Sequence, residues 1–267
     1  MKEIKLDELK KIQIGILDVV HYFCQENGIT YFLSSGSLIG AIRHKGYIPW
    51  DDDIDLYMPR KDYDRFLSVF NKDNRHLYRV ISIQTDYKCT LAFAKVERTD
   101  TRIIEHVDNP MELGINIDIF PVDGVPDDLK ERTKYFARIQ RIRNELVLKD
   151  VSLDFRRRGL IKNIILLLGK VFLLHKSMRL LAEQLDMSID KGNSDSQYVC
   201  NLVMGNGIKS VFTRDAISDS TDVEFEGKFY KTMKGFDEYL TKTYGNYMLL
   251  PPIEKRVSHH VFTAYWK

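Results

Sequence analysis

The sequence lacks several features that would assign it at once to a common class of protein. Only three of its 267 residues are cysteines, Cys24, Cys89 and Cys200, and they are far apart and without the spacing of a metal site. An odd number of isolated cysteines argues against a disulfide framework. We therefore expect each cysteine to be a small core residue in a reducing compartment.

An excess of one charge and long hydrophobic runs are also missing. The 40 basic and 38 acidic residues give a net charge of +2, so the overall charge gives no reason to expect a nucleic-acid partner. No uncharged stretch is long enough to cross a bilayer, and the N-terminal segment has no signal-peptide core. With 44% hydrophobic and 29% charged residues, the composition indicates a globular protein, which we expect in the cytoplasm.

What the sequence has instead is a concentration of carboxylates at the end of one stretch, SSGSLIGAIRHKGYIPWDDDIDLYM, residues 34–58. Asp53 and Asp55 alternate with Ile54 and Leu56, which is the pattern of a half-buried strand in which residues i and i+2 share a face. Two adjacent carboxylates repel each other unless a cation or a proton lies between them. The pair therefore predicts a Mg²⁺ or Mn²⁺ site.

Two other readings of the acidic stretch are weaker. An acidic run is commonly a solvated surface, but the alternating apolar residues argue for burial. A calcium loop that starts at Asp51 would need Gly at its sixth position and Glu at its twelfth, and Leu56 and Asp62 stand there. We interpret Asp51, at the start of the strand, and Asp52, on its opposite face, as neighbours that tune or orient the two ligands.

The residues before the acids suggest a phosphate site. Gly36 and Ser37 open an expected helix, and a Gly-Ser turn at a helix start exposes backbone N–H groups and a hydroxyl to an anion. The same pair also occurs in ordinary turns and helix caps. Further candidate cations follow at Arg43, His44 and Lys45.

A second acidic strand is expected in GINIDIF, residues 114–120, where Asn116 and Asp118 share one face and three isoleucines share the other. Asp118 is either a third metal ligand or a strand-end residue that caps the following turn, PVDGVPDD. Lys95, in the apolar strand LAFAKVE, is either an edge residue that reaches water or a buried cation that faces the acids.

The remainder of the chain contains long helical patterns and a basic C-terminal segment. Helices are expected at 6–27, 127–149 and 236–244, and helical structure at 155–185, where lysines interrupt an apolar run. That run is either a buried helix or a basic amphipathic segment on an anionic membrane. After Pro251-Pro252, four residues are either phosphate-binding cations or a solvated tail: Lys255, Arg256, His259 and His260.

These patterns predict an α+β fold, with a mixed β-sheet core, flanking helices and a helical region. We divide the chain into a catalytic core at 1–126, a helical region at 127–192 and a C-terminal segment at 193–267 that completes the site.

Three blocks of the sequence resemble the LicD family, which includes bacterial phosphocholine transferases and is related to the fukutin group. They are GSLIGAIRHKGYIPWDDDIDLYMPRKDYDRF, GINIDIFPVDGVPDD and FEGKFYKTMKGFDEYLTKTYGNYMLLPPIEKRVSHH. That family is similar to the polymerase-β-like nucleotidyltransferases, in which a Gly-Ser turn precedes an Asp-x-Asp strand and a third acid lies on a neighbouring strand. Gly36-Ser37, Asp53, Asp55 and Asp118 follow that order.

The resemblance implies a nucleotidyltransferase-like core that binds two divalent ions, Mg²⁺ or Mn²⁺, through Asp53, Asp55 and Asp118. The implied reaction transfers phosphocholine or a related substituted phosphate from CDP-choline or another CDP-linked donor to a glycan or lipid-linked glycan, with release of CMP. The donor phosphates would lie at Gly36 and Ser37, with the further cations Arg43, His44, Lys45 and Lys95. The acceptor would be teichoic acid, lipopolysaccharide or capsule. The protein itself would be cytoplasmic, with peripheral contact to the inner membrane surface.

Choline is a quaternary ammonium ion, which aromatic faces bind well. Tyr47, Trp50 and Tyr57 lie near the acids in sequence, with Asp51 beside them, although we slightly favour packing as the role of the aromatic residues. Three other functions remain open: attachment of a nucleotide to the acceptor, metal-dependent glycosyl transfer, and metal binding without catalysis. The fate of the nucleotide separates the first from the implied reaction.

Overall fold

The structure is a computed structural model, and it describes residues 2–73, 77–105, 110–151, 153, 155–189, 193–205, 207–257 and 262–267. Side chains at 155–158 are outside this description. The helices are α1 (Leu6–Asn27), α2 (Ser35–His44), α3 (Arg60–Val69), α4 (Leu129–Asp150), α5 (Phe155–Phe172), α6 (Met178–Ser188) and α7 (Phe236–Tyr244). Short 3₁₀ turns lie at Phe70–Lys72, Gly207–Ser210, Arg214–Ile217 and Ile253–Lys255.

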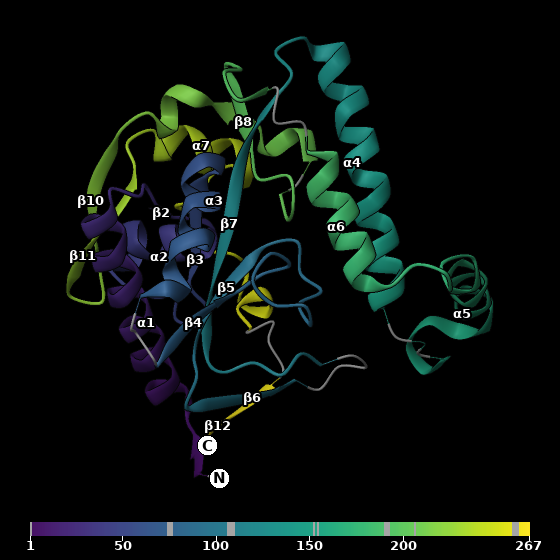
Figure 1. Ribbon diagram of the computed structural model, residues 1–267, viewed down its shortest axis with the longest axis horizontal. Coiled ribbons are helices and arrows are strands. Elements are labelled where there is room, and N and C mark those ends of the chain that lie inside the picture. Colours follow the sequence, from purple (N-terminus) through teal and green to yellow (C-terminus); the bar gives the residue numbers. More distant parts are fainter. Residues whose placement is uncertain are drawn as a thin grey trace.

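A mixed sheet forms the centre of the molecule, with strand order β2-β3-β7-β5-β4 (Figure 1). Its strands are β2 (Phe32–Leu33), β3 (Asp55–Pro59), β7 (Asn116–Val125), β5 (Ala94–Arg98) and β4 (Tyr78–Ile81). The β3–β7 pair is parallel, and the other neighbours along this path are antiparallel. Helices α1 and α3 both contact β7 and cover the fully buried face of the sheet. The predicted α+β class, a mixed sheet with flanking helices, is confirmed.

Smaller strands complete the fold around this sheet. A three-stranded sheet has the order β1 (Lys2–Ile4), β12 (Phe262–Trp266), β6 (Thr101–Glu105). The strands β10 (Ser220–Phe225) and β11 (Lys228–Met233) form a hairpin. The strand β8 (Tyr198–Cys200) joins the far end of β7 to β9 (Phe212–Thr213). Each of these three smaller groups of strands therefore contains at least one strand from the last third of the chain.

The first helix follows directly from the amphipathic pattern of its residues. Leu9, Ile12, Ile16 and Phe23 recur at helical spacing and are buried in the core. Gly28 ends the helix in the left-handed conformation, at φ 58°, with its N–H bonded to carbonyl groups of the last turn. The predicted helix at 6–27 is confirmed.

The prediction that the second acidic strand ends at Phe120 is wrong, because β7 continues through Pro121 to Val125. The end of the strand pairs with β8, where Asp123 is opposite Cys200 and Val125 is opposite Tyr198. This partner lies about 75 residues away in the sequence, so local turn signals could not reveal it. Asp118 consequently lies inside a strand, and its interpretation as a strand-end cap is also wrong.

The helical region forms an arm beside the sheet. Helices α4 and α6 pack against each other, and α5 lies beyond them at the margin of the molecule (Figure 1). Asp128 caps α4 by accepting the N–H groups of Lys130 and Glu131, as its position in the sequence predicts. Among the described residues, no helix is long and apolar enough to cross a membrane. The three cysteines are buried and unpaired, as expected.

A buried ion pair connects this arm to the sheet, and it gives a prediction about stability. Arg60 donates two hydrogen bonds to Asp123, at 2.6 and 2.9 Å, and a third to Asp186 of α6 at 3.0 Å. Arg60→Met should lower the free energy of unfolding by about 3–5 kcal/mol, because it leaves the Asp123 carboxylate buried without its partner. Urea unfolding measures this change.

Two further variants make this experiment specific. Arg60→Met combined with Asp123→Leu should recover much of the loss, since both buried charges are then gone. Lys234→Met, which removes an exposed pair with Asp219, should change stability by less than about 1 kcal/mol. Equal losses in Arg60→Met and Lys234→Met would contradict a stabilising role for the buried pair.

Candidate active site

The acidic residues meet across two neighbouring strands. Asp55, the first residue of β3, is directly opposite Asp118 on β7. The N–H of Asp118 donates to the carbonyl of Ile54 at 2.9 Å, which fixes the register. Asp53 lies just before β3, and the side chain of Asp52 is buried while its carbonyl accepts a hydrogen bond from Gln13. The sheet thus brings together the three acids that the sequence analysis selected.

Lys95 faces these acids, which resolves the choice that the sequence left open. It is opposite Asp118 on β5, and its ammonium group donates to the Asp118 carboxylate and, at 3.2 Å, to Asn116. Both Lys95 and Asp118 are mostly buried. Lys95 is therefore a buried cation that partly neutralises the acids, rather than an exposed edge residue.

Burial and mutual repulsion both disfavour charge on the carboxylates of this cluster. The pKa of Asp55 is raised well above its ordinary value, first by burial and then by the nearby charges of Asp53, Asp118 and Asp51, while Lys95 opposes the shift. Carboxylate oxygens are the ligands that Mg²⁺ and Mn²⁺ prefer, and a divalent cation would remove this repulsion. The donor set thus fits such an ion, although no three Asp, Glu, His or Cys side chains in the described residues are already grouped around one metal position.

The start of α2 lies against the acids. Ser37 is buried, and its hydroxyl oxygen accepts the N–H of Asp55 at 2.9 Å. Ser34, the N-cap of this helix, is fully buried, and its hydroxyl has no hydrogen-bond partner among the described residues. A carboxylate oxygen of Asp51 lies over Gly36, 2.6 Å from where a Cβ atom would be, so a side chain at that position would clash. The helix start is thus a tight site that already accommodates an anion.

A group of cations lies around the other end of α2. Arg43 donates to the carbonyls of Tyr247 and Leu249, at 2.9 and 3.2 Å, and to His44 at 2.9 Å, so it holds the C-terminal loop in place. Burial lowers the pKa of Arg43, and the charge of Arg256 lowers it further. The pKa of His44 is lowered by burial and by Arg43. Like charges are therefore concentrated here too, about 10 Å along the helix from Gly36.

The other predicted cations are either exposed or outside the described residues. Lys45 is exposed at the C-terminal end of α2, where it adopts the left-handed conformation at φ 60°. Lys255 is exposed on the turn Ile253–Lys255. His259 and His260 lie outside the described residues.

Of the aromatic candidates, Trp50 is the one that the structure leaves partly accessible. The guanidinium of Arg256 lies 5.6 Å from the centre of its ring. Tyr47 is buried against Phe225 and its hydroxyl donates to Gln13 at 3.0 Å. Tyr57 is also buried, and its hydroxyl accepts from Tyr239 at 3.1 Å. Packing accounts for both tyrosines.

The structure adds residues that the sequence analysis did not select. Tyr239 and Tyr244 extend from α7 to the start of α2, and the hydroxyl of Tyr239 accepts the N–H of Ser35 at 3.2 Å. The pKa of Tyr244 is raised mainly by burial, with Asp55 and Asp53 contributing. The sequence signal for these tyrosines was weak, because Tyr239 follows Asp55 by 184 residues and Asp118 by 121 residues. The sequence did point to Asn116, because strand alternation places its side chain on the same face as that of Asp118.

A cavity of about 980 Å³ opens at the β4 edge of the same sheet, and its lining includes none of the three acids. Its lining includes Ile81, which is opposite Lys95 in register and therefore lies two strands, about 10 Å, from Asp118. The opposite wall is formed by Lys149 and Asp150, at the end of α4, and by Met178, at the start of α6.

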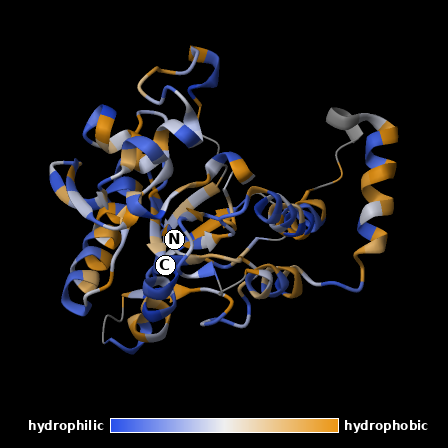
Figure 2. Cartoon of the chain, turned by 90° about the horizontal axis from the view of Figure 1, so that it is seen from above, coloured by the Kyte–Doolittle hydropathy of each residue, from blue (hydrophilic) through white to orange (hydrophobic). Residues whose placement is uncertain are grey.

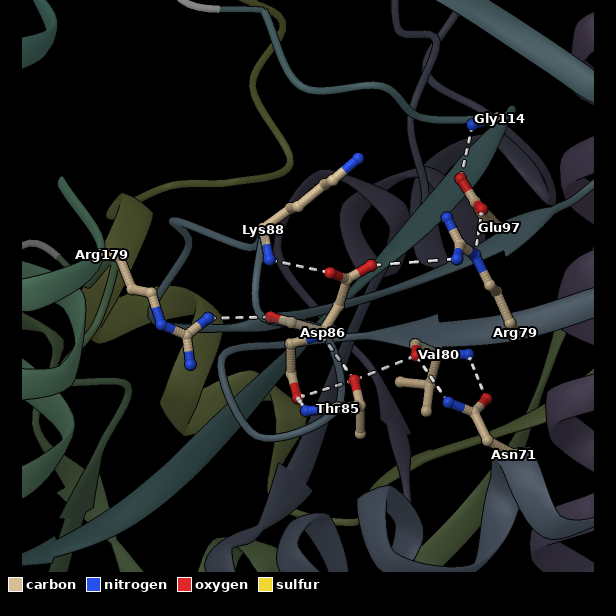
Figure 3. Close-up of polar contacts among 10 residues, drawn as sticks. Asn71, Arg79, Val80, Thr85, Asp86, Lys88, Glu97, Gly114 and Arg179 are labelled. Atoms are coloured by element: carbon tan, nitrogen blue, oxygen red, sulfur yellow. Dashed lines mark hydrogen bonds and ion pairs between the residues drawn. The ribbon is translucent and has the colours of Figure 1, made fainter.

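The loop that borders this cavity is firmly held (Figure 3). Arg179 donates to the carbonyls of Ile83 and Asp86, both at 2.8 Å, and Arg79 lies between Glu97 and Asp86. Tyr87, at the tip of the loop, lines the cavity and is 77% exposed. The cavity therefore presents an aromatic ring and charged groups from a rigid frame.

Comparison with known proteins places these features in one family. Residues 28–151 match the family described as LicD/FKTN/FKRP, nucleotidyltransferase domain, and this segment includes the start of α2, the acids and Lys95. The chain is 33% identical to the lipopolysaccharide cholinephosphotransferase LicD of Haemophilus influenzae, over 99% of both chains. It is 41% identical to human ribitol 5-phosphate transferase FKRP over 51 residues, which are 19% of this chain and 9% of that protein.

The raised pKa of Asp55 predicts how the protein's stability depends on pH. A carboxyl group whose pKa is higher in the folded state favours folding below its unfolded pKa of about 4, and this contribution is lost as the pH rises through the folded pKa. Without divalent ions at neutral pH, Asp55→Asn should therefore raise the melting temperature by a few degrees. The difference from wild type should vanish in acid.

Exposed Asp195 provides the control, because Asp195→Asn should leave the melting temperature unchanged at every pH. Adding Mg²⁺ or Mn²⁺ should stabilise wild type more than Asp55→Asn. A lower melting temperature for Asp55→Asn than for wild type in the metal-free protein would show that repulsion does not govern this site.

Proposed function

The chain belongs to the LicD family, and we propose that it transfers phosphocholine from CDP-choline to a hydroxyl group of a cell-surface glycan, with release of CMP. The pairing of Asp55 with Asp118 across β3 and β7, within the segment that matches the family, is the observation that carries this proposal. Similarity over the whole chain to a lipopolysaccharide cholinephosphotransferase supports choline as the substituent and a glycan as the acceptor.

The site supports a division of roles among its residues. Asp53, Asp55 and Asp118 would hold Mg²⁺ or Mn²⁺, most suitably two ions, because a diphosphate adds further negative charge to a site where one lysine faces several carboxylates. Such an ion, when bound, neutralises charge on the phosphate oxygens. Ser34 and the start of α2 would bind donor phosphate, since the helix terminus favours anions and the Ser34 hydroxyl lacks a partner in the described structure.

The reaction forms one bond and breaks one at phosphorus. The acceptor oxygen bonds to the phosphorus that carries choline, and the bond from this phosphorus to the bridging oxygen breaks, so that the bridging oxygen leaves with CMP. Asp118 would accept the hydroxyl proton, and Lys95 would keep Asp118 oriented. Arg43 and Arg256 lie where they would attract the nucleotide phosphate, beside the accessible face of Trp50.

We also propose that the acceptor sugar binds in the cavity at the β4 edge of the sheet. Its volume lies within the usual range of about 300–1,000 Å³ for ligand sites. Sugars bind through contact of a ring face with an aromatic side chain and through hydrogen bonds with charged groups, and Tyr87 and Asp86 offer both at the cavity. The proposed site of reaction is the cytoplasmic side of the membrane, where CDP-linked donors are made.

A panel of CDP-linked donors tests the reaction. CDP-choline labelled in choline should give CMP and labelled lipopolysaccharide, faster than CDP-ethanolamine, CDP-glycerol or CDP-ribitol. Asp53→Asn should reduce turnover by roughly 10³-fold or more, because loss of a metal ligand costs several kcal/mol of transition-state stabilisation. Its circular dichroism spectrum should be unchanged. Nucleotide on the acceptor, or full turnover by Asp53→Asn, would overturn the proposal.

Tyr87→Ala tests the acceptor cavity separately. It should raise KM for the acceptor by about 3- to 10-fold, since contact with an aromatic ring contributes about 0.5–1.5 kcal/mol. KM for CDP-choline and the slow hydrolysis of CDP-choline in water should not change. Tyr22→Ala is the matched control, because Tyr22 is also exposed but lies on α1 and not at the cavity. An acceptor KM unaffected by Tyr87→Ala would place the acceptor elsewhere.

A further inference from the structure

Helix α5 carries an apolar surface that nothing in the described structure covers. Nine hydrophobic residues between 160 and 174 are each 45–78% exposed: Leu160, Ile161, Ile164, Ile165, Leu167, Leu168, Val171, Phe172 and Leu174. Figure 2 shows this helix at the margin of the molecule, with hydrophobic residues along its length. Scattered exposed apolar residues are normal in a protein surface, but a contiguous set indicates a binding surface.

The spacing of these residues places most of them on one side of the helix. Ile161, Ile165, Leu168 and Phe172 are separated by four, three and four residues, which is the repeat of an α-helical face. We call this set the α5 stripe. Gly159 is not helical, at φ 72° and ψ 172°, so the continuous part of α5 that carries the stripe runs from residue 160 to residue 172. This part is about 20 Å long, so the stripe offers an extended ridge rather than an isolated contact.

Polar contacts, rather than burial of the stripe, hold α5 in place. Lys149 of α4 donates to the carbonyls of Leu173 and Lys176 just after α5. In return, Lys170 donates to the carbonyl of Lys149 at 3.0 Å. Gly169 faces Leu148 so closely that a Cβ atom there would lie 2.9 Å from it. The inner side of the helix is thus fixed on α4, and the stripe remains outside.

The basic residues near the stripe indicate the kind of surface that it would bind. From Phe155 to Ala182 the sequence has no aspartate or glutamate, while it has Arg156, Arg157 and Arg158 at the start and further lysines along the helix. Lys162 is exposed beside the stripe. A helix with an exposed apolar face, basic residues and no acids is suited to the interface of a membrane that contains anionic lipid.

We propose that α5 lies in the surface of an anionic membrane, with the α5 stripe in the acyl boundary and Lys162 among the head groups. The position of the helix supports this. The chain leaves the wall of the cavity at Asp150, forms α5 and returns to the same wall at Met178. A membrane on α5 therefore lies next to the cavity, and a lipid-linked substrate could reach it without leaving the surface.

Vesicle binding by the intact protein tests this inference without any donor or acceptor, so it stands apart from the proposed function. Wild-type protein should sediment with vesicles of phosphatidylglycerol and phosphatidylcholine, and much less with phosphatidylcholine alone. Ile165→Ser with Phe172→Ser should lower partitioning by at least about tenfold, because it removes two large side chains from the acyl boundary. Lys162→Glu should lower it by roughly tenfold in low salt and less in high salt.

Leu129→Ser is the matched control for the apolar substitutions. Leu129 is 65% exposed, as Ile165 is 64%, but it lies at the opposite end of α4. It should leave vesicle binding unchanged, and all variants should keep the wild-type melting temperature. Failure of the wild type to bind anionic vesicles would overturn the proposal. So would a dimer in solution that the double substitution dissociates, since the stripe would then be a protein interface.

Discussion

Repulsion among the carboxylates of Asp53, Asp55 and Asp118 is the constraint on which the rest of the site depends. Burial, and then the charges of the neighbouring acids, raise the pKa of Asp55, so the ionised carboxyl lowers the stability of the folded protein. The fold opposes this repulsion with hydrogen bonds from the backbone of Asp55 to the start of α2. The carbonyl of Asp55 accepts the N–H of Ser34 at 3.0 Å, and its own N–H donates to Ser37. The same contacts fix the start of α2 beside the acids.

A second concentration of like charge lies at the other end of α2. Arg43 and Arg256 approach closely enough that one lowers the pKa of the other, and carbonyl groups of the C-terminal loop hold Arg43 in place. Acids at one end of a helix and cations at the other match a ligand whose phosphates lie between a metal and basic side chains. A CDP-linked donor has a diphosphate that could lie between a metal held by the acids and these cations. Its binding would offset the repulsion between like charges at both ends of α2.

Short-range pattern in the sequence predicted much of the site, because alternation in a strand fixes which side chains share a face. It placed Asp55 and Asp118 on the strand faces opposite their buried apolar neighbours, and their pairing followed once β3 and β7 were neighbours. The sequence could not show that Lys95 is opposite Asp118, since the register of distant strands depends on the whole sheet. For the same reason the extension of β7 along β8 was missed.

Side-chain roles that depend on distant contacts were the least predictable. Arg43 was expected to bind phosphate directly, but much of its hydrogen-bonding capacity holds the loop at 247–249. Ser37 was expected to contact phosphate, whereas the structure uses its oxygen to support Asp55 and leaves the hydroxyl of Ser34 without a partner among the described residues. Motif position therefore identified a helix terminus that lies against the acids, but only packing shows which hydroxyl is available there.

The arrangement of the cavity and α5 is what a soluble donor and a membrane-bound acceptor would require of one active site. A nucleotide-linked donor is charged and arrives from water, so its site can lie at the α2 side of the acids. An acceptor carried on lipid has its sugar in water and its chain in the bilayer, and it must be bound where both are accommodated. The cavity and the α5 stripe share the ends of α4 and α6. Arg60 fixes α6 to the sheet, and α4 packs against α6. If α5 lies on a membrane as proposed, this packed framework would set the distance from the membrane to the acids, and a sugar bound at the cavity would need no movement of the central sheet to approach the donor phosphate.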